Sequence, residues 1–412
     1  QGNDTLNGFY GSDTYHFNRG DGQDLILDRG GVDRIVFGED ISVSDVTFSS
    51  LYNDLVITIM DPSNPSISDR ITIREARGGS SQNYQIEALQ FASGEVITSA
   101  EMMQFASNVE LTEEADAYTT SEFFDDTVRS LGGNDNIRLL GGNDIVYAGE
   151  GDDLVLLTGA TVNAQIFGEG GNDTLEAQSY GSFVHIDGGE GNDHIEGGRF
   201  ADNTLLGGAG NDTIMAAASS YTQTADHSNS ITGGLGNDTL YGFYGSDTYH
   251  FNRGDGQDTL RDYGSSYNKS DRIVFGEGIL VSDVTFSGLN NDLVITITDS
   301  NNPGANDQIT VKDARGVSAQ YYQIEELQFA SGEVITSAEM MESASNVELS
   351  EEADTYTTSQ YFDDTVHSLG GDDTIRVKGG NDIVYAGEGD DLVQLTGATV
   401  NAQIFGEGGN DR

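Results

Sequence analysis

The sequence predicts an all-β protein built as a tandemly repeated β-solenoid. Three observations carry this prediction: a glycine-rich period of nine residues, a larger repetition, and short apolar runs of β type between turns. The larger repeat is seen where Gly141 to Leu156 returns almost unchanged from Gly379, an offset of 379 − 141 = 238 residues. Repetition at a fixed period is the sequence signature of solenoids and similar arrays.

The small repeat is clearest in three strings, which are GGEGNDHIE from Gly188, GGAGNDTIM from Gly207 and GGLGNDTLY from Gly233. Each follows the pattern G-G-x-G-x-D-x-U-x, where U is a large apolar residue. Glycine allows the left-handed backbone of a tight turn, so the first six residues are expected to form a turn. The last three form a short strand whose U residue points inward, and these residues include Ile137, Val146, Val155, Leu175, Ile195, Ile214, Leu240 and Tyr249.

The turns offer oxygen ligands. A glycine turn leaves backbone carbonyls exposed, and the sixth-position aspartate adds a carboxylate. Such hard oxygen donors are the ligands that calcium prefers, although aspartate also favours turns without any ion. The predicted carboxylate ligands are Asp4, Asp13, Asp24, Asp135, Asp144, Asp153, Asp173, Asp193, Asp212, Asp238, Asp247, Asp258, Asp373, Asp382, Asp391 and Asp411. The candidate carbonyl ligands are those of Gly188, Glu190, Gly207, Ala209, Gly233 and Leu235.

Composition supports a cation-dependent fold. The formal net charge is −51, from 69 acidic and 18 basic residues, and such charge opposes compaction unless cations neutralise it. It excludes nucleic acid and argues against anionic lipid as a partner. Cysteine is absent, and the apolar runs are too short to insert into a membrane. Calcium is therefore the expected cofactor.

Spacing predicts how the strands are wound. Successive sixth-position aspartates from Asp153 to Asp238 are 20, 20, 19 and 26 residues apart. Each step is interpreted as one rung of two strands, in which one turn keeps the glycine–aspartate pattern. The other turn is expected to be a longer loop that binds no calcium, as in 176–184 and 216–229.

The stretch from Arg34 to Ile97 has another pattern, with the β-type runs RIVF, DVTF, DLVITI and DRITI. Thr98, with Glu101 three residues later, resembles a capping box that begins one short helix. This stretch is expected to be a separate compact module, with a twin at about 272–345. The predicted segments are 1–27, the end of a solenoid; 28–110, a β-rich module; 111–261, a calcium solenoid; 262–348, a second module; and 349–412, the start of the next solenoid.

The nonapeptides resemble the RTX ("repeats in toxin") family of calcium-binding repeat proteins. The resemblance implies a right-handed parallel β-roll with calcium between adjacent turns. It also implies a bacterial protein that type I secretion exports unfolded and that folds outside the cell. On YHFNRGDGQD, DRIVFG and IEALQFASGEVI, the intervening modules resemble the haemolysin-type calcium-binding protein related domain. The runs before Asp135 and Asp144 lack the first glycine pair, so weaker calcium sites are expected there.

The sequence gives no sign of catalysis. The six histidines lack the H-E-x-x-H spacing of a zinc protease. The adjacent carboxylates Asp125–Asp126 and Asp363–Asp364 could form a catalytic pair, but neighbours on a strand point to opposite faces. They are interpreted instead as turns where a roll begins, at which calcium could also bind. We therefore expect that the chain is not an enzyme.

Three function classes remain open. We expect a calcium-dependent structural segment of a longer extracellular or bacterial cell-surface protein, such as an adhesin stalk, surface layer or filament. The alternatives are a passive calcium-folding and secretion module of a toxin or enzyme, and a glycan- or receptor-binding module, for which Arg19-Gly20-Asp21 is a weak candidate. Chains could associate end to end or side by side. The modules are expected to cap the rolls at a stiff joint, with Tyr118, Phe123 and Phe124 buried there.

Overall fold

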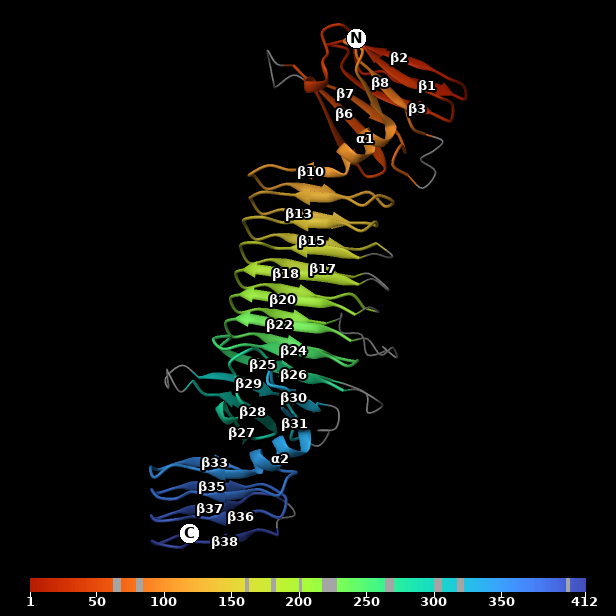
Figure 1. The fold of residues 1–412 in the computed structure, drawn as a ribbon. Coiled ribbons are helices and arrows are strands. Elements are labelled where there is room, and N and C mark those ends of the chain that lie inside the picture. The colour runs from red at the N-terminus through yellow and green to blue at the C-terminus, as the bar shows by residue number, and fades with distance from the viewer. Residues whose placement is uncertain are drawn as a thin grey trace. The chain divides into compact units, whose positions relative to one another are not determined.

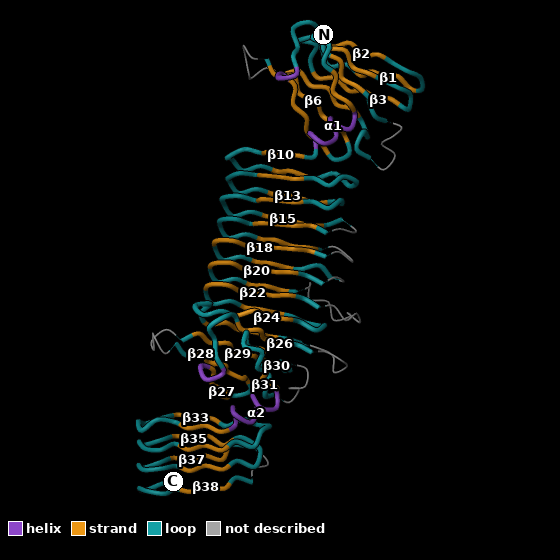
Figure 2. Tube along the Cα trace, viewed as in Figure 1, coloured by secondary structure: helices purple, strands orange, loops and turns teal. Residues whose placement is uncertain are grey.

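A computed structural model describes residues 1–61, 68–78, 84–159, 163–178, 183–199, 202–216, 228–263, 270–299, 306–316, 322–397 and 401–412. The chain divides into two compact units, Gln1–Ile186 and Asp187–Arg412. Figure 1 shows strands throughout both units, with the short helices α1 and α2, and Figure 2 shows the short strands alternating with turns. The described helices are all too short or too polar to cross a membrane.

The described part of the first unit contains one α-helix, a short 3-10 helix (Val43–Asp45) and many short strands. Its elements are β1 (Thr5–Phe9), β2 (Thr14–Phe17), β3 (Gln23–Asp28), β4 (Arg34–Phe37), β5 (Val46–Leu51), β6 (Asp54–Met60), β7 (Ser68–Ile73), β8 (Ala88–Gln90), β9 (Val96–Thr98), α1 (Ser99–Ala106), β10 (Asn108–Glu110), β11 (Ala117–Thr119), β12 (Thr127–Arg129), β13 (Asn136–Leu139), β14 (Ile145–Tyr147), β15 (Leu154–Leu157), β16 (Ala164–Phe167) and β17 (Thr174–Ala177). Strand β18 (Val184–Glu190) begins in this unit.

From β10 onward the first unit is a parallel roll. Even-numbered strands pair in the order β10-β12-β14-β16, and odd-numbered strands in the order β11-β13-β15-β17. In the odd sheet the register aligns Ile137 with Val155 and Val155 with Leu175. These three side chains are 0% exposed, so each rung adds one layer to a column of aliphatic residues.

The stretch before this roll extends two other sheets. Strand β3 pairs in parallel with both β1 and β7, and β7 continues into the antiparallel β6 and β5. The second sheet has the order β2-β4-β8-β9. Helix α1 follows β9, and its N-cap Thr98 exchanges hydrogen bonds with Glu101 as the capping box requires. The predicted helix start is confirmed.

The second unit repeats this plan. Its elements are β19 (His194–Glu196), β20 (Thr204–Ala209), β21 (Thr213–Met215), β22 (Ser230–Leu235), β23 (Thr239–Tyr241), β24 (Thr248–Phe251), β25 (Gln257–Arg261), β26 (Arg272–Phe275), β27 (Val284–Leu289), β28 (Asp292–Ile297), β29 (Asp307–Val311), β30 (Glu326–Gln328), β31 (Val334–Thr336), α2 (Ser337–Ser345), β32 (Asn346–Glu348), β33 (Thr355–Thr357), β34 (Thr365–His367), β35 (Thr374–Val377), β36 (Ile383–Tyr385), β37 (Leu392–Leu395) and β38 (Gln403–Phe405).

In the second unit the roll passes directly into the stretch predicted as a module. Strand β25 pairs in parallel with β29, and β29 continues into the antiparallel β28 and β27. In the other sheet β26 pairs with β30, which turns back into β31. The strand pairing therefore does not set this stretch apart as a separate module. A further roll of two parallel sheets follows α2, with the orders β32-β34-β36-β38 and β33-β35-β37.

The predicted fold class is confirmed, because the chain is an all-β protein built from parallel solenoid rungs. All eight predicted inward residues are 0% exposed. Each rung consists of two strands, one in each sheet, as the spacing indicates. Of the loops 176–184 and 216–229, residues 179–182 and 217–227 lie outside the described residues. The boundaries of the five predicted segments stay a prediction.

Candidate calcium sites

The sixth-position aspartates form a ladder along the roll. In each described pair, Oδ1 of one aspartate accepts the backbone N–H of the aspartate one rung earlier. The N–H of Asp135 lies 2.7 Å from Oδ1 of Asp153 in the first unit. In the second unit the N–H groups of Asp193 and Asp212 each lie 2.8 Å from the next carboxylate, those of Asp212 and Asp238. Within each unit, the ladder brings one carboxylate per rung into a buried column.

The second carboxylate oxygen, Oδ2, differs from Oδ1 in its hydrogen bonding. Oδ2 is buried and has no hydrogen-bond partner among the described residues in Asp135, Asp153, Asp212, Asp238, Asp373 and Asp391. A buried carboxylate oxygen without a partner is costly, and a bound cation removes that cost. This pattern fits calcium and repeats along both units.

The first position of the turn has no room for a side chain, which explains why glycine occupies it. A Cβ added to Gly207 would lie 2.2 Å from Oδ2 of Asp212 and 2.4 Å from the carbonyl oxygen of Gly233. The next two glycines of this turn, Gly208 and Gly210, have φ of 110° and 138°. The pattern G-G-x-G therefore brings a carboxylate and a carbonyl oxygen together beside a backbone that only glycine can form.

The predicted carbonyl ligands lie in these same turns. The third-position carbonyls of Ala209 and Leu235 accept the N–H of Gly191 and Gly210, each at 2.7 Å, which leaves each oxygen a second lone pair. Gly188 adjoins Oδ2 of Asp193 as Gly207 adjoins that of Asp212. Which carbonyls, including those of Gly233 and Glu190, contact an ion stays a prediction.

Burial raises the pKa of several of these carboxyl groups. The pKa is about 7 for Asp212, about 6 for Asp153 and about 8 for Asp258. Burial is the largest cause in each case, and neighbouring aspartate charges add to it. Hydrogen bonds from backbone N–H groups act in the opposite direction. The buried column therefore disfavours bare negative charge and favours a proton or a cation.

Not every predicted aspartate has the same surroundings. Asp144 and Asp382 are buried, but Oδ2 of each accepts a hydrogen bond from a threonine hydroxyl, Thr120 at 3.0 Å and Thr358 at 2.9 Å. Asp4 and Asp411, in the first and last turns, are exposed. The other predicted positions are buried or half-buried, namely Asp13, Asp24, Asp135, Asp153, Asp173, Asp193, Asp212, Asp238, Asp247, Asp258, Asp373 and Asp391.

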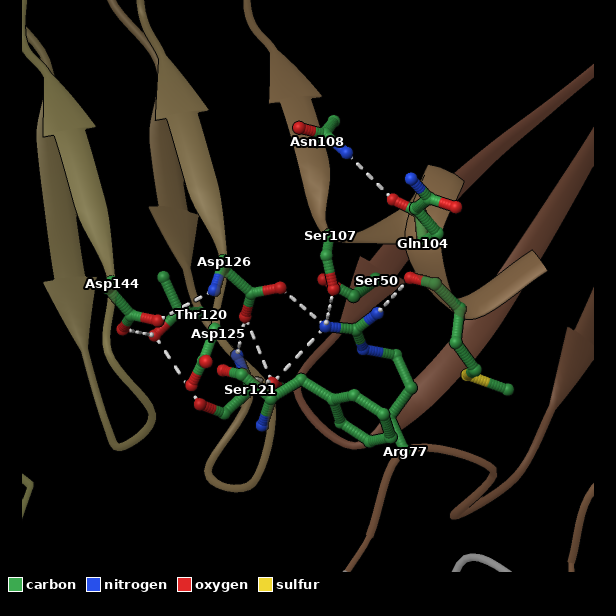
Figure 3. Close-up of polar contacts among 12 residues, drawn as sticks. Ser50, Arg77, Gln104, Ser107, Asn108, Thr120, Ser121, Asp125, Asp126 and Asp144 are labelled. Atoms are coloured by element: carbon green, nitrogen blue, oxygen red, sulfur yellow. Dashed lines mark hydrogen bonds and ion pairs between the residues drawn. The ribbon is translucent and has the colours of Figure 1, made fainter. Parts of the chain in front are cut away.

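The paired aspartates lie one rung inside each roll and not where the roll begins, since Asp125–Asp126 precede β12 and Asp363–Asp364 precede β34, and the partner of Asp126 is an arginine. Arg77 and Asp126 form an ion pair in which neither side chain is exposed. Ser107 and Ser121 also accept hydrogen bonds from the guanidinium, at 3.0 and 3.2 Å (Figure 3). Sequence reasoning missed Arg77, because 49 residues separate it from Asp126.

The joint predicted around these residues is partly wrong. Tyr118 is half-buried, and its hydroxyl lies 2.5 Å from Oγ of Ser50. Phe124 packs against the hydrophobic core that precedes the roll. Phe123, however, is 49% exposed and does not belong to the joint. Both phenylalanines lie in the bend at 122–124 before β12, and only Phe124 packs against that core.

The Arg19-Gly20-Asp21 tripeptide is engaged within the fold. Arg19 lies 2.6 Å from Oδ2 of Asp45, and the N–H of Gly20 donates to Asp69 at 2.7 Å. Oδ2 of Asp21 accepts the N–H of Asn18 at 2.8 Å. These contacts support the structural interpretation of this turn.

Comparison with known proteins agrees with the site chemistry. The model of the RTX calcium-binding nonapeptide repeat matches residues 1–24, 122–155, 163–179, 183–203, 198–220, 224–260 and 360–393. The model of the haemolysin-type calcium binding protein related domain matches residues 292–339. No curated protein matches this chain.

Among solved structures, the chain is similar to the extracellular lipase LipA from Serratia marcescens, with 19% sequence identity and a TM-score of 0.17. The match covers 75% of this chain and 36% of the lipase chain, so this chain spans about a third of the lipase's length. The family matches, together with the buried aspartate ladder, identify calcium as the cofactor. The chain therefore contains RTX calcium-binding nonapeptide repeats and a haemolysin-type calcium binding protein related domain.

Proposed function

We propose that this chain is a calcium-dependent structural segment of a longer secreted protein, located outside the cell or on the bacterial cell surface, where it serves as an adhesin stalk, surface layer or filament. The observation that carries this proposal is the direct passage from one roll to the next within each unit. In the second unit α2 packs between the β27–β28 hairpin and β32, the first strand of the following roll. A segment that only assists export has no need of such a connection.

The edges of the sheets support the same proposal. A solenoid that ends in unpaired parallel strands exposes backbone groups that pair with other chains. In the second unit, β29 is covered by the antiparallel strands β28 and β27, and β30 by β31. These hairpins act as caps between rolls, as repeat arrays require. We propose that chains associate, end to end or side by side, only through sheet edges that no antiparallel strand covers.

The proposal also holds that the segment is not an enzyme. The adjacent carboxylates Asp125 and Asp126 are both committed to structural contacts, since the buried Asp126 binds Arg77 and the exposed Asp125 accepts the N–H of Asn143 at 2.7 Å. The runner-up function is a passive calcium-folding and secretion module. The nonapeptide repeat itself supports this alternative, because such a repeat could serve a secreted toxin or enzyme that has no stalk.

Deletion of this segment from the gene in the producing bacterium separates the two functions. If the role is structural, the shortened protein is still exported, but its distance from the cell surface or its assembly changes in electron micrographs. If the segment serves secretion, the remainder of the protein stays inside the cell. Retained export with unaltered surface material would contradict a structural role. Hydrolytic activity that is lost with the segment would contradict the non-enzymatic role.

A further inference from the structure

At two places along the chain, the sixth-position aspartate of a turn lies together with two further carboxylates. These groups are Asp13, Asp28 and Asp33 in the first unit, and Asp247, Asp262 and Asp271 in the second. Within each group, one carboxylate oxygen of every residue lies within 4.8 Å of the others. Calcium–oxygen distances are 2.3–2.6 Å, so two oxygens on opposite sides of one ion are about 5 Å apart. One ion can therefore contact all three side chains.

A second observation points to a ligand. Asp247 is 0% exposed, and its Oδ2 has no hydrogen-bond partner among the described residues. Its Oδ1 accepts two hydrogen bonds from Asn229, from the backbone N–H at 2.9 Å and from Nδ2 at 2.7 Å, so the carboxylate is held in place. In the first unit, Asp33 is 1% exposed, its Oδ1 accepts the N–H of Asp13 at 2.7 Å, and its Oδ2 has no hydrogen-bond partner in the described part of the chain.

The backbone leaves room for these oxygens to converge. A Cβ added to Gly242 would lie 2.7 Å from Oδ2 of Asp247 and 2.8 Å from Oδ2 of Asp262. It would also lie 2.0 Å from the hydroxyl oxygen of Tyr249. The three oxygen atoms therefore face the same point beside Gly242. The equivalent atoms of Tyr15, Asp28 and Asp13 converge in the same way beside Gly8, at 2.2, 2.6 and 2.9 Å.

From this geometry we propose that each group, with its buried tyrosine hydroxyl, binds one divalent cation of the size of calcium through side chains. The tyrosine is a neutral ligand or a donor to the group. Tyr249 donates to Oδ2 of Asp262 at 2.7 Å, and burial keeps its pKa well above the usual value. Burial and the charges of Asp262 and Asp271 also raise the pKa of Asp247, so positive charge is attracted here.

This three-carboxylate site differs from the other turn sites in its number of carboxylate ligands and in the strands that it connects. A turn site offers one side-chain carboxylate per rung, whereas this site offers three. Asp247 precedes β24, Asp262 follows β25 and Asp271 precedes β26. An ion bound here links the last nonapeptide turn to the first strand of the stretch that follows. More carboxylate ligands give tighter calcium binding, so we expect an affinity roughly tenfold above that of the turn sites.

The inference goes beyond the proposed structural role and requires only that the chain folds with calcium. The test uses the 412-residue chain with Asp28→Asn and Asp262→Asn together, which preserve side-chain shape and remove one charge from each group. Bound calcium is counted in an equilibrium titration. The expected result is the loss of two ions from the tightest class of sites. Asp212→Asn is the matched control, because it alters one turn site and should leave that tightest class intact.

Terbium supplies a readout that does not depend on the count. The chain has no tryptophan, so terbium luminescence excited through the protein reports on ions near tyrosine. The Tyr15→Phe/Tyr249→Phe variant should keep its tightest ions and lose most of their luminescence. An unchanged ion count in the double asparagine variant would overturn the proposal. So would a terbium-loaded crystal of the wild-type chain without anomalous density between Asp247, Asp262 and Asp271, which decides the matter even if a variant does not fold.

Discussion

Arg77 and Asp126 form an ion pair that is fully shielded from solvent and joins two segments far apart in the sequence. Arg77 follows β7, and Asp126 immediately precedes β12, the second rung of the following roll. The second unit repeats the arrangement with Arg315 and Asp364, whose charged atoms are 2.5 Å apart. In both units an aromatic ring lies against the guanidinium, 4.6 Å away for Phe124 and 5.2 Å for Phe362. The connection between cap and roll is therefore a specific contact.

Replacement of Arg77 by Met should destabilise this connection by about 3 kcal/mol or more, because it leaves the Asp126 carboxylate buried without its partner. The measurement is amide hydrogen exchange of residues 107–129 in millimolar calcium. Arg74→Met is the control, since the Arg74 side chain is 51% exposed and its pair with Asp54 spans 3.8 Å. Equal exchange in the two variants would show that the buried pair does not hold the joint.

Removal of calcium should unfold the rolls. The net charge of −51 and the buried carboxylate column both oppose the fold when no cation is bound. Circular dichroism in excess EGTA should lose the β signal at neutral pH and regain it in millimolar calcium. A spectrum that is indifferent to the chelator would contradict calcium-dependent folding.

Acid should partly replace calcium. The folded-state pKa values of Asp153, Asp212 and Asp258, at about 6, 7 and 8, lie above the usual value of about 3.9 for unfolded aspartate. The folded chain then binds more protons than the unfolded chain, so the calcium-free fold is most stable below about pH 4 and loses stability as the pH rises towards 8.

The measurement is circular dichroism from pH 4 to pH 8 in calcium-free buffer, where the β signal should fall as the pH rises. Asp212→Asn should flatten this dependence, because it removes one of the groups that titrate. A calcium-free β signal that grows with pH would have the wrong sign for buried carboxylates.

Asp212→Ala and Asp193→Ala should weaken calcium binding more than Asp135→Ala does. The first two aspartates belong to complete nonapeptides, whereas Asp135 follows Ser130 and Leu131 in place of the glycine pair. In that turn Leu131 has φ of 70°, so a residue with a side chain is held in left-handed backbone. Calorimetric titration should show the difference, and equal losses would mean that the glycine pair does not determine site quality.

Glycine should improve an imperfect turn. Glu169 is exposed and has φ of 70°, a conformation that costs about 1 kcal/mol for a residue other than glycine. Glu169→Gly should therefore lower the calcium concentration at which the chain folds. Glu150→Gly removes the same charge from an exposed position without a left-handed backbone, and should not stabilise the chain. A shared response would indicate that charge, not backbone strain, is responsible.

Sequence reasoning succeeded where a periodic pattern determined the outcome. Ile137, Val155 and Leu175 are buried because each rung repeats the position of the last. It failed where a contact depends on residues outside the period. Asp144, like Asp153, occupies the sixth position of a turn, yet the hydroxyl of Thr120, one rung earlier, donates a hydrogen bond to its second oxygen. The partnership of Arg77 with Asp126 has no local signal either.

The aspartate ladder gives the roll a direction of growth. The N–H of Asp212 is satisfied only when Asp238 of the next rung is in place, and the N–H of Asp238 in turn requires Asp258, 2.9 Å away. Each rung thus completes the one before it, and assembly resembles the closing of a zipper from neighbour to neighbour. Under tension, such a chain would release its length one rung at a time, starting from an unprotected end, and each released rung would return its ions to the surrounding fluid.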